Sequence, residues 1–318
     1  MISSDTRTFM PALDGSGLEA RRFGAARPDW LMVGASGRVG RMMRAAWPSG
    51  PDARMRIVPQ MRVPQAGQAQ AMGEGALCWA PLEGPEPFER YVRADGTPAA
   101  MLMLAGVIPG AGADYTANVG LAVACLEAAK EAGCGRVIIA SSAAVYDPFA
   151  HMPVAEDGVL APASAYGASK LAMEQACAPY RALGIDVCSL RIGDVLGADG
   201  LMRNAHKGRP LVIDRFADGR GPMRSYIGPA TLARVLGTLA ASPDPLPEVL
   251  NVAAPFGCAM VDIAEAAGLD WAWRDAPVDA VQNVTLETAR LEEIYTFARD
   301  EVTARDMVAQ LRHMPRAQ

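Results

Sequence analysis

Short apolar runs alternate with longer segments of helical spacing over most of the chain. The runs are too short for helices and are apolar on both faces, which predicts buried strands of a parallel sheet. They cover residues 30–33, 55–58, 76–79, 99–104, 136–140 and 187–191. Helical spacing and strong helix formers follow at residues 41–47, 113–132 and around 166–176. The alternation predicts an α/β fold with a doubly wound parallel sheet covered by helices on both faces.

A glycine-rich turn follows the first predicted strand at once. It has the spacing Gly34-x-x-Gly37-x-x-Gly40 and leads into the first predicted helix. Glycine lets the backbone approach a pyrophosphate closely, and the start of a helix supplies free N–H groups. The alternative is a strand-to-helix turn that binds nothing. The candidate cofactor residues here are Gly34, Ser36, Gly37, Arg38, Val39 and Gly40.

The tip of the second predicted strand bears on the choice of cofactor. Pro59 is expected to end this strand, since proline does not serve a central ladder. No carboxylate follows within Gln60-Met61-Arg62, although an acidic residue at this tip binds the ribose 2′-hydroxyl of NAD. Arg62 could instead pair with a 2′-phosphate, as could Arg38, or both could be solvated surface arginines. We therefore predict NADP in preference to NAD.

Tyr166 and Lys170 stand four residues apart in a helical segment and therefore share one face. A cation about 4 Å from a phenolate contributes at most ~4 kcal/mol at an effective dielectric constant near 20, or roughly three pKa units. This predicts a tyrosine of lowered pKa that exchanges a proton with an alcohol or ketone oxygen. The alternative is an incidental pair on a surface helix. Only three lysines occur, among many arginines, which favours a selected ammonium at Lys170.

Composition narrows the class of protein. The 318 residues are 51% hydrophobic and carry a net charge of −5, which predicts a globular chain without a nucleic-acid surface. The six cysteines and three histidines are scattered, which predicts reduced thiols, a cytoplasmic location and no metal site. No apolar run reaches membrane-spanning length, and no signal-peptide pattern begins the chain.

Together these motifs resemble an extended short-chain dehydrogenase/reductase of the NAD-dependent epimerase/dehydratase family. The resemblance covers residues 30 to about 265, and its sheet would end with a strand at 250–252. The matching segments are the glycine turn, Leu104-Ala105-Gly106, Asn118-Val119, residues 141–146, Tyr166-x-x-x-Lys170, residues 191–197 and residues 224–227. The family has a Rossmann-like sheet with a small C-terminal substrate lobe.

The resemblance also implies roles for individual residues. Ser142 would bond the substrate oxygen, Tyr166 would be the acid/base, and Lys170 would tune it and hold the nicotinamide ribose. Asn118 would be a further catalytic residue beside the cofactor, and the alternative is an amide on the surface of a helix. Leu104, Ala105, Gly106 and Ile192 would line the cofactor site, and Asp194 and Arg224 would contact substrate.

The chain departs from the family pattern at several points. Dehydratases carry an Asp-Glu pair where Ala143 and Ala144 stand, and two methyl groups cannot move the protons of a 4,6-dehydration. The third strand lacks the family's aspartate at Trp79-Ala80-Pro81, so adenine would be held by backbone or apolar contacts. The acidic pair that usually follows Arg224 is also missing, so Arg224 would pair elsewhere or grip a simpler anion.

We therefore predict that the chain is organised in three parts. Residues 1–29 form an extension, residues 30–194 with about 225–254 form the dinucleotide-binding domain, and about 195–224 with 255–318 form the substrate lobe. The predicted activity is hydride transfer at a secondary alcohol or ketone carbon of a sugar or nucleotide sugar, by an epimerase or a reductase/dehydrogenase. The alternative is a cofactor-binding regulatory or scaffold protein with a vestigial site. We expect a small-molecule substrate, no nucleic acid and no membrane, and a homodimer is left open.

Overall fold

A seven-stranded parallel sheet forms the centre of the computed structural model, which describes residues 29–47, 55–62, 75–110, 112–205 and 209–314. The strand order is β3-β2-β1-β4-β5-β6-β11. The strands are β1 (Asp29–Val33), β2 (Arg56–Met61), β3 (Leu77–Cys78), β4 (Ala100–Met103), β5 (Arg136–Ser142), β6 (Asp186–Ile192) and β11 (Val249–Val252). This confirms the predicted Rossmann-like sheet. The predicted extension at residues 1–29 lies outside the described residues except for Asp29, which begins β1.

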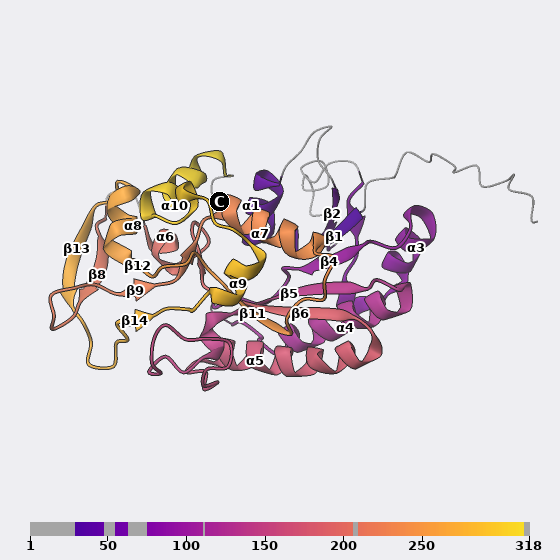
Figure 1. Ribbon diagram of the computed structural model, residues 1–318, viewed down its shortest axis with the longest axis horizontal. Coiled ribbons are helices and arrows are strands. Elements are labelled where there is room, and N and C mark those ends of the chain that lie inside the picture. The colour runs from indigo at the N-terminus through magenta and orange to yellow at the C-terminus, as the bar shows by residue number, and fades with distance from the viewer. Residues whose placement is uncertain (1–28, 48–54, 63–74, 111, 206–208, 315–318) are drawn as a thin grey trace, which may run out of the picture.

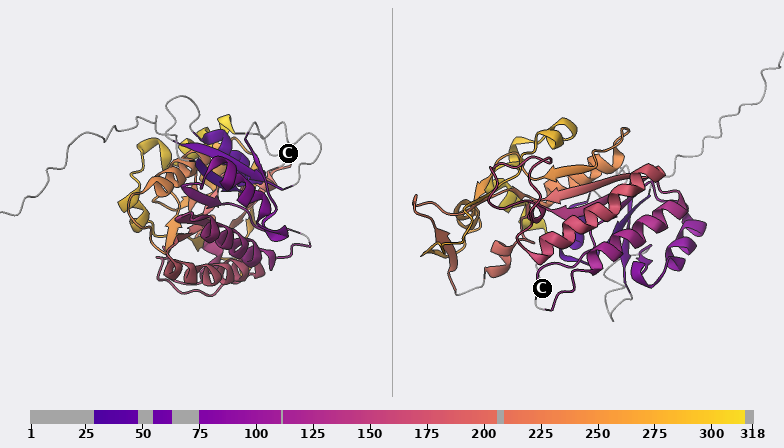
Figure 2. Two further views of the ribbon diagram at one scale, coloured as in Figure 1. Left: turned by 90° about the vertical axis from the view of Figure 1, so that its right-hand side faces the viewer. Right: turned by 90° about the horizontal axis from the view of Figure 1, so that it is seen from below.

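Helices cover both faces of the sheet (Figure 1). On one face lie α1 (Arg38–Ala46) and α7 (Pro229–Ala241), and on the other α3 (Glu86–Asp95), α4 (Ala117–Ala132) and α5 (Ala165–Cys177). Seen from below, α4 and α5 run side by side along the sheet (Figure 2). The short helices around them are η1 (Pro81–Glu83), η2 (Ala143–Val145) and η3 (Ala178–Leu183).

The second strand is longer than predicted and runs through Pro59. In the β1–β2 pairing Pro59 lies opposite Met32, while β3 pairs with β2 only from Gln60 onward. On its β3 side, therefore, Pro59 faces no paired strand, and its missing N–H removes no ladder hydrogen bond there. The prediction that Pro59 ends the strand is wrong, because this proline occupies a local sheet edge. Gln60 consequently belongs to the strand and points into the protein, where it is 3% exposed.

Most of the remaining elements form a smaller lobe beyond the carboxyl ends of β6 and β11, whereas α9 (Ala289–Ile294) packs against β11 (Figures 1 and 2). Its core gathers Leu201, Ile213, Tyr226, Ile263 and Met307, all buried. The elements after β6 are β7 (Asp194–Val195), α6 (Gly200–Asn204), β8 (Leu211–Arg215), β9 (Met223–Arg224), β10 (Tyr226–Ile227), β12 (Cys258–Ala259), α8 (Met260–Ala266), β13 (Trp271–Asp275), β14 (Asn283–Val284), α9 (Ala289–Ile294), η4 (Arg299–Glu301), α10 (Ala304–Gln310) and η5 (Leu311–His313). A substrate-binding role for this lobe stays a prediction, as do the domain boundaries.

Candidate active site

The glycine turn joins β1 to α1 with little space for side chains. Gly34 has φ +86°, and a Cβ there would lie 2.5 Å from the backbone nitrogen of Ala105. A Cβ on Gly40 would lie 2.3 Å from the Gly34 carbonyl oxygen. The first position therefore needs glycine for its backbone angle and its contact with the β4 loop, and the third for the packing of α1 onto the turn. Gly37 is the N-cap residue of α1, and Arg38 and Val39 are the first two residues of that helix.

Gln60 fastens this turn to the sheet, which the sequence did not indicate. Its Oε1 accepts a hydrogen bond from the Gly34 backbone N–H at 2.7 Å, and its Nε2 donates to the carbonyl of Trp79. One buried amide thus links the ends of β1, β2 and β3. The sequence did show a polar residue, Gln60, at the strand tip where an acidic residue is usual. Whether its side chain points into the protein or outward depends on how far β2 extends, which the sequence did not show.

A hollow of about 310 Å³ opens between the glycine turn and the loop after β4. It is lined by Gly34, Ser36 and Gly37 from the turn, Leu104, Ala105 and Gly106 after β4, Arg62 after β2, and residues 80–83. Ser36 and Arg62 are exposed at the hollow, whereas Arg38 is half-buried on α1. A concave, glycine-lined site at the carboxyl edge of a parallel sheet fits a dinucleotide, and the backbone and apolar atoms of residues 80–82 fit the adenine end.

Tyr166 and Ser142 come together from α5 and the end of β5. The Ser142 hydroxyl is near enough to the Tyr166 phenol to act on its pKa, and the Tyr115 ring meets that of Tyr166 edge-on with 6.1 Å between centroids. Burial raises the pKa of Tyr166, and the neighbouring Ser142 hydroxyl acts in the opposite direction. The expected lowering of this pKa by Lys170 is therefore wrong for this structure, because the cost of burying a phenolate exceeds the stabilisation available. Tyr115 is a neighbour that sequence reasoning missed.

Lys170 lies one helical turn beyond Tyr166 and is 4% exposed. Its Nζ donates to the carbonyl of Ala140 at 2.7 Å, and burial lowers the pKa of Lys170 to about 8. A Cβ on Gly106 would lie 3.1 Å from both this Nζ and Asn118 Oδ1. The bare backbone of Gly106 therefore joins the dinucleotide hollow to the Tyr166 site.

Asn118 shapes the site from within. It is fully buried, its Oδ1 accepts from Val107 N at 2.7 Å, and its Nδ2 donates to Ser169 Oγ at 3.0 Å and to Val107 O at 3.2 Å. Ser169 Oγ in turn donates to the carbonyl of Tyr166 at 2.7 Å. These bonds use the amide to tie the loop after β4 to the helix of Tyr166, which is a positioning role. The surface-amide alternative is excluded.

Three further predicted residues lie at the end of β6 or after it. Ile192 pairs in register with Ser142 and is 8% exposed. Burial, and then the charge of Asp199, raise the pKa of Asp194 to about 6, while Arg224 acts against both. Arg224 donates to the carbonyls of Met223 at 2.8 Å, Gln282 at 2.7 Å and Val281 at 3.0 Å. Much of its guanidinium is therefore occupied by the backbone of the lobe, next to the Asp194 carboxyl.

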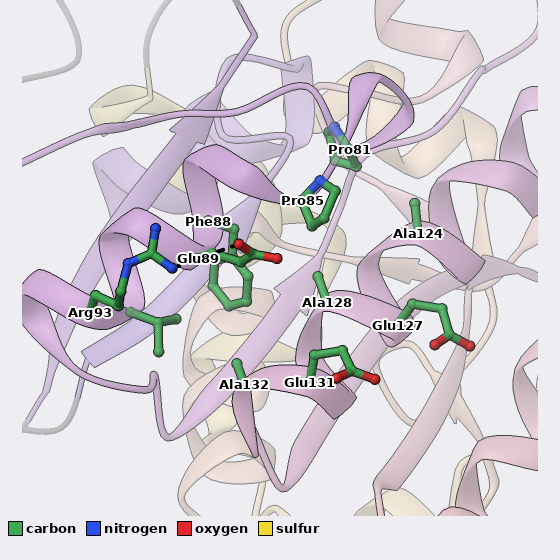
Figure 3. Close-up of a pocket in the computed structure, with 11 residues that line it drawn as sticks. Pro81, Pro85, Phe88, Glu89, Arg93, Ala124, Glu127, Ala128, Glu131 and Ala132 are labelled. Carbon is green, nitrogen blue, oxygen red and sulfur yellow. Dashed lines mark ion pairs between the residues drawn. The ribbon is translucent and has the colours of Figure 1, made fainter.

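A second hollow, of about 440 Å³, lies between α3 and α4 (Figure 3). The charged side chains that line it are paired: Glu89 with Arg93 at 3.7 Å, and both Glu127 and Glu131 with Lys130, which lies outside the lining. It contains none of the predicted site residues. Over the described ranges, no group of three or more His, Cys, Asp or Glu side chains is placed to hold a metal ion. In the same ranges, no helix combines the length and apolar character needed to cross a bilayer.

The chain is similar to several known proteins. Over 116 residues the chain is 34% identical to a UDP-glucose 4-epimerase of Streptomyces lividans, a match covering 35% of each chain. The chain thus matches about a third of the length of that relative. Among solved structures, a UDP-glucose 4-epimerase of Thermus thermophilus in complex with NAD has a TM-score of 0.68 and 22% identity, covering 89% of this chain and 99% of that one.

A dehydratase has the same fold. The structure of an NAD-dependent NDP-hexosamine 5,6-dehydratase involved in tunicamycin biosynthesis has a TM-score of 0.70 and 20% identity, covering 89% of this chain and 96% of that one. The model of the NAD dependent epimerase/dehydratase family matches residues 30–235, from the first strand to α7. Since this match spans more than half of the sequence, the chain belongs to the NAD dependent epimerase/dehydratase family, among the extended short-chain dehydrogenases/reductases.

Proposed function

We propose that the protein catalyses reversible hydride transfer at a secondary alcohol or ketone carbon of a sugar or nucleotide sugar. The observation that carries this proposal is that Tyr166 and Ser142 lie next to each other, with the buried Lys170 one turn along the same helix. These groups lie where the carboxyl edge of the sheet meets the dinucleotide hollow, so a proton and a hydride can be exchanged at adjacent atoms.

Each residue has a distinct task in this proposal. Ser142 holds the reacting oxygen of the substrate, and Tyr166 gives a proton to that oxygen or takes one from it. The Lys170 ammonium stabilises negative charge that develops on the phenol. A bound nicotinamide dinucleotide supplies or accepts the hydride, and Gly34, Gly37 and Gly106 leave room for it. The raised pKa of Tyr166 keeps the phenol protonated at neutral pH and thus ready to act as an acid.

An epimerase or a reductase fits the site better than a 4,6-dehydratase does. Ala143 and Ala144 form the start of η2 directly after Ser142, where the eliminating acid and base would be needed. The structural similarity to a 5,6-dehydratase is a similarity of fold, and water loss from the substrate is the outcome that would oppose this part of the proposal. A scaffold protein with a vestigial site is the second candidate, although the intact Tyr166, Lys170 and Ser142 oppose it.

Mass spectrometry of small molecules released from the purified, denatured protein tests the proposal. Stoichiometric dinucleotide, together with interconversion of a nucleotide sugar and its epimer, would support an epimerase. A protein that carries no dinucleotide and consumes added NADPH with a ketone would support a reductase. Failure of both assays across a panel of nucleotide sugars and polyols would favour the scaffold.

The identity of the cofactor belongs to the same proposal. The tip of β2 supplies a neutral amide, and the geometry turns Gln60 inward, away from a ribose. Arg62 is exposed at the rim of the hollow and can pair with a 2′-phosphate. We therefore propose NADP in preference to NAD. NAD is the alternative, since Glu83 lines the same hollow and its negative charge would oppose a phosphate.

Replacing Arg62 by alanine is expected to weaken NADPH binding about tenfold and leave NADH binding unchanged. The expected loss corresponds to one charge-assisted hydrogen bond of about 1.5 kcal/mol at a partly solvated site. Titration of both dinucleotides by fluorescence measures it. Arg93→Ala is the matched control, because Arg93 pairs with Glu89 in the other hollow. Equal losses for the two dinucleotides would contradict the assignment.

A nucleotide-sugar substrate, a homodimer and a cytoplasmic location stay predictions. The substrate class is supported by the nucleotide-sugar enzymes among the similar proteins and by Arg224 beside Asp194 in the lobe. A sugar diphosphate would have to compete with the three carbonyls that Arg224 now bonds. A simpler anion is the alternative that this arrangement leaves open.

A further inference from the structure

Three side chains of α5, each one turn after the last, contact consecutive residues at the end of β5. The Tyr166 phenol lies next to the Ser142 side chain, Lys170 Nζ donates to the carbonyl of Ala140, and the Glu174 carboxylate accepts from Ser141 Oγ. The proposed function uses the first two contacts. Glu174 makes the third, and it is a buried acidic residue, 7% exposed, with no task in that function.

Arg191 of β6 holds Glu174 from the other side. Its Nη2 donates to Glu174 Oε2 at 2.8 Å, and its Nε lies 3.2 Å from both carboxylate oxygens. Arg191 is itself 3% exposed, and its Nη1 donates to Tyr146 OH at 2.9 Å and to the carbonyl of Glu156 at 2.8 Å. With every polar group partnered, the orientation of the carboxylate is determined on all sides.

Lys170 needs such a neighbour because it lies out of water with weak direct partners. Its Nζ has one backbone carbonyl and, at 3.9 Å, the Met173 thioether, and neither carries a charge. A buried ammonium is stabilised chiefly by a nearby negative charge. The titratable groups that act on it are Glu174 and Cys177 on its own helix, of which Glu174 has the larger effect. Beyond Glu174, the β6 side of the cluster presents the positive Arg191.

We propose that Glu174 is a positioning residue of the active site, whose carboxylate, fixed by Arg191 and Ser141, keeps the Lys170 ammonium charged. Lys170 can then act on the Tyr166 phenol while bonded only to neutral atoms. The consequence for catalysis rests on the proposed function. The electrostatic link between Glu174 and Lys170 does not, since both groups belong to the protein itself.

The composition of the chain makes this link measurable. Lysine occurs only at positions 130, 170 and 207, so the full chain with ¹³C-labelled lysine has three Cε signals whose pH titrations can be followed by NMR. The signal that Lys170→Arg removes belongs to Lys170. In Glu174→Gln, the midpoint of that signal is expected to fall by about 1 unit or more, the usual effect of losing an opposite charge at close range.

Glu127→Gln is the matched control. Glu127 pairs with Lys130 on the exposed side of α4, so this substitution is expected to lower the midpoint of Lys130 and leave that of Lys170 in place. A Lys170 midpoint unchanged in folded Glu174→Gln would overturn the inference. So would a Lys170 midpoint that falls equally in both variants, since the effect would then not depend on Glu174.

A second variant guards against loss of folding. Glu174→Gln leaves the buried guanidinium of Arg191 unpaired, whereas the double variant E174Q/R191Q removes both charges and keeps amides that can bond each other. In the double variant the Lys170 midpoint is expected to fall less than in the single variant, because the repulsion from Arg191 is lost as well. A midpoint that falls as far in the double variant as in Glu174→Gln would show that Arg191 does not oppose Glu174 at Lys170, and a midpoint unchanged in both folded variants would overturn the inference. The titration needs neither substrate nor dinucleotide, so an inactive protein would contradict the proposed function alone.

Discussion

Replacing Tyr166 by phenylalanine is expected to lower kcat by about 10²- to 10⁴-fold, the range found for loss of a positioned acid or base. Phenylalanine keeps the ring and its edge-on contact with Tyr115, so the shape of the site is preserved. What disappears is the hydroxyl next to Ser142, which is the group proposed to carry the exchanged proton. Steady-state kinetics with the substrate found by the panel assay, alongside dinucleotide titration, would measure the loss in kcat with little change in cofactor affinity.

Tyr91→Phe is the control for this substitution. The Tyr91 hydroxyl bonds Asp29 at 3.1 Å at the opposite, amino edge of the sheet. The substitution removes a phenolic hydroxyl far from the candidate active site, so turnover is expected to stay close to that of the parent. A Tyr166→Phe variant as active as the parent would remove the proposed acid/base and, with it, the mechanism.

Replacing Gly40 by alanine is expected to weaken dinucleotide binding by at least about tenfold and to lower the melting temperature. The new Cβ would lie 2.3 Å from the Gly34 carbonyl oxygen and 2.7 Å from the Ala35 Cα. Both atoms belong to the backbone, so the clash is relieved only by moving α1 away from the turn. That movement separates the N-terminus of α1 from the glycine turn, and these are the two parts proposed to hold the pyrophosphate. Overpacking of this kind typically costs about 1–3 kcal/mol, so calorimetry and dinucleotide titration should both detect it.

Gly135→Ala is the corresponding control, because a Cβ there would have no atom within 4 Å and Gly135 precedes β5 at the other edge of the sheet. It is expected to leave both the melting temperature and the affinity nearly unchanged. If Gly40→Ala bound dinucleotide like the parent, the close packing of the turn would not be what positions the cofactor.

Several features of this protein follow from the sequence because they depend on local spacing. The alternation of apolar runs and helical segments predicts the parallel sheet, since both periods are properties of the backbone itself. The glycine turn is recognisable because the close packing of Gly40 against Gly34 and Ala35 involves residues only a few positions apart. Tyr166 and Lys170 share a face for the same reason, as four residues nearly complete one helical turn.

The tertiary structure decided the features that depend on neighbours distant in the chain. The inward direction of the Gln60 side chain depends on where β3 begins to pair with β2. That pairing begins with Gln60 opposite Leu77, which is 17 residues later in the chain. Asn118 is buried and links two other segments because its side-chain amide is hydrogen-bonded to Val107 and Ser169. Sequence spacing alone shows neither partner.

The electrostatics of the site were decided in the same way. Spacing along α5 predicted that Lys170 would lower the pKa of Tyr166. In the structure burial raises that pKa, and the Lys170 ammonium donates to a carbonyl of β5. Glu174 lies on the next turn of the same helix, yet the role proposed for it depends on its ion pair with Arg191 of β6. The charge of a buried group is set by its desolvation and by the charges packed against it, and both are known only once the chain has folded.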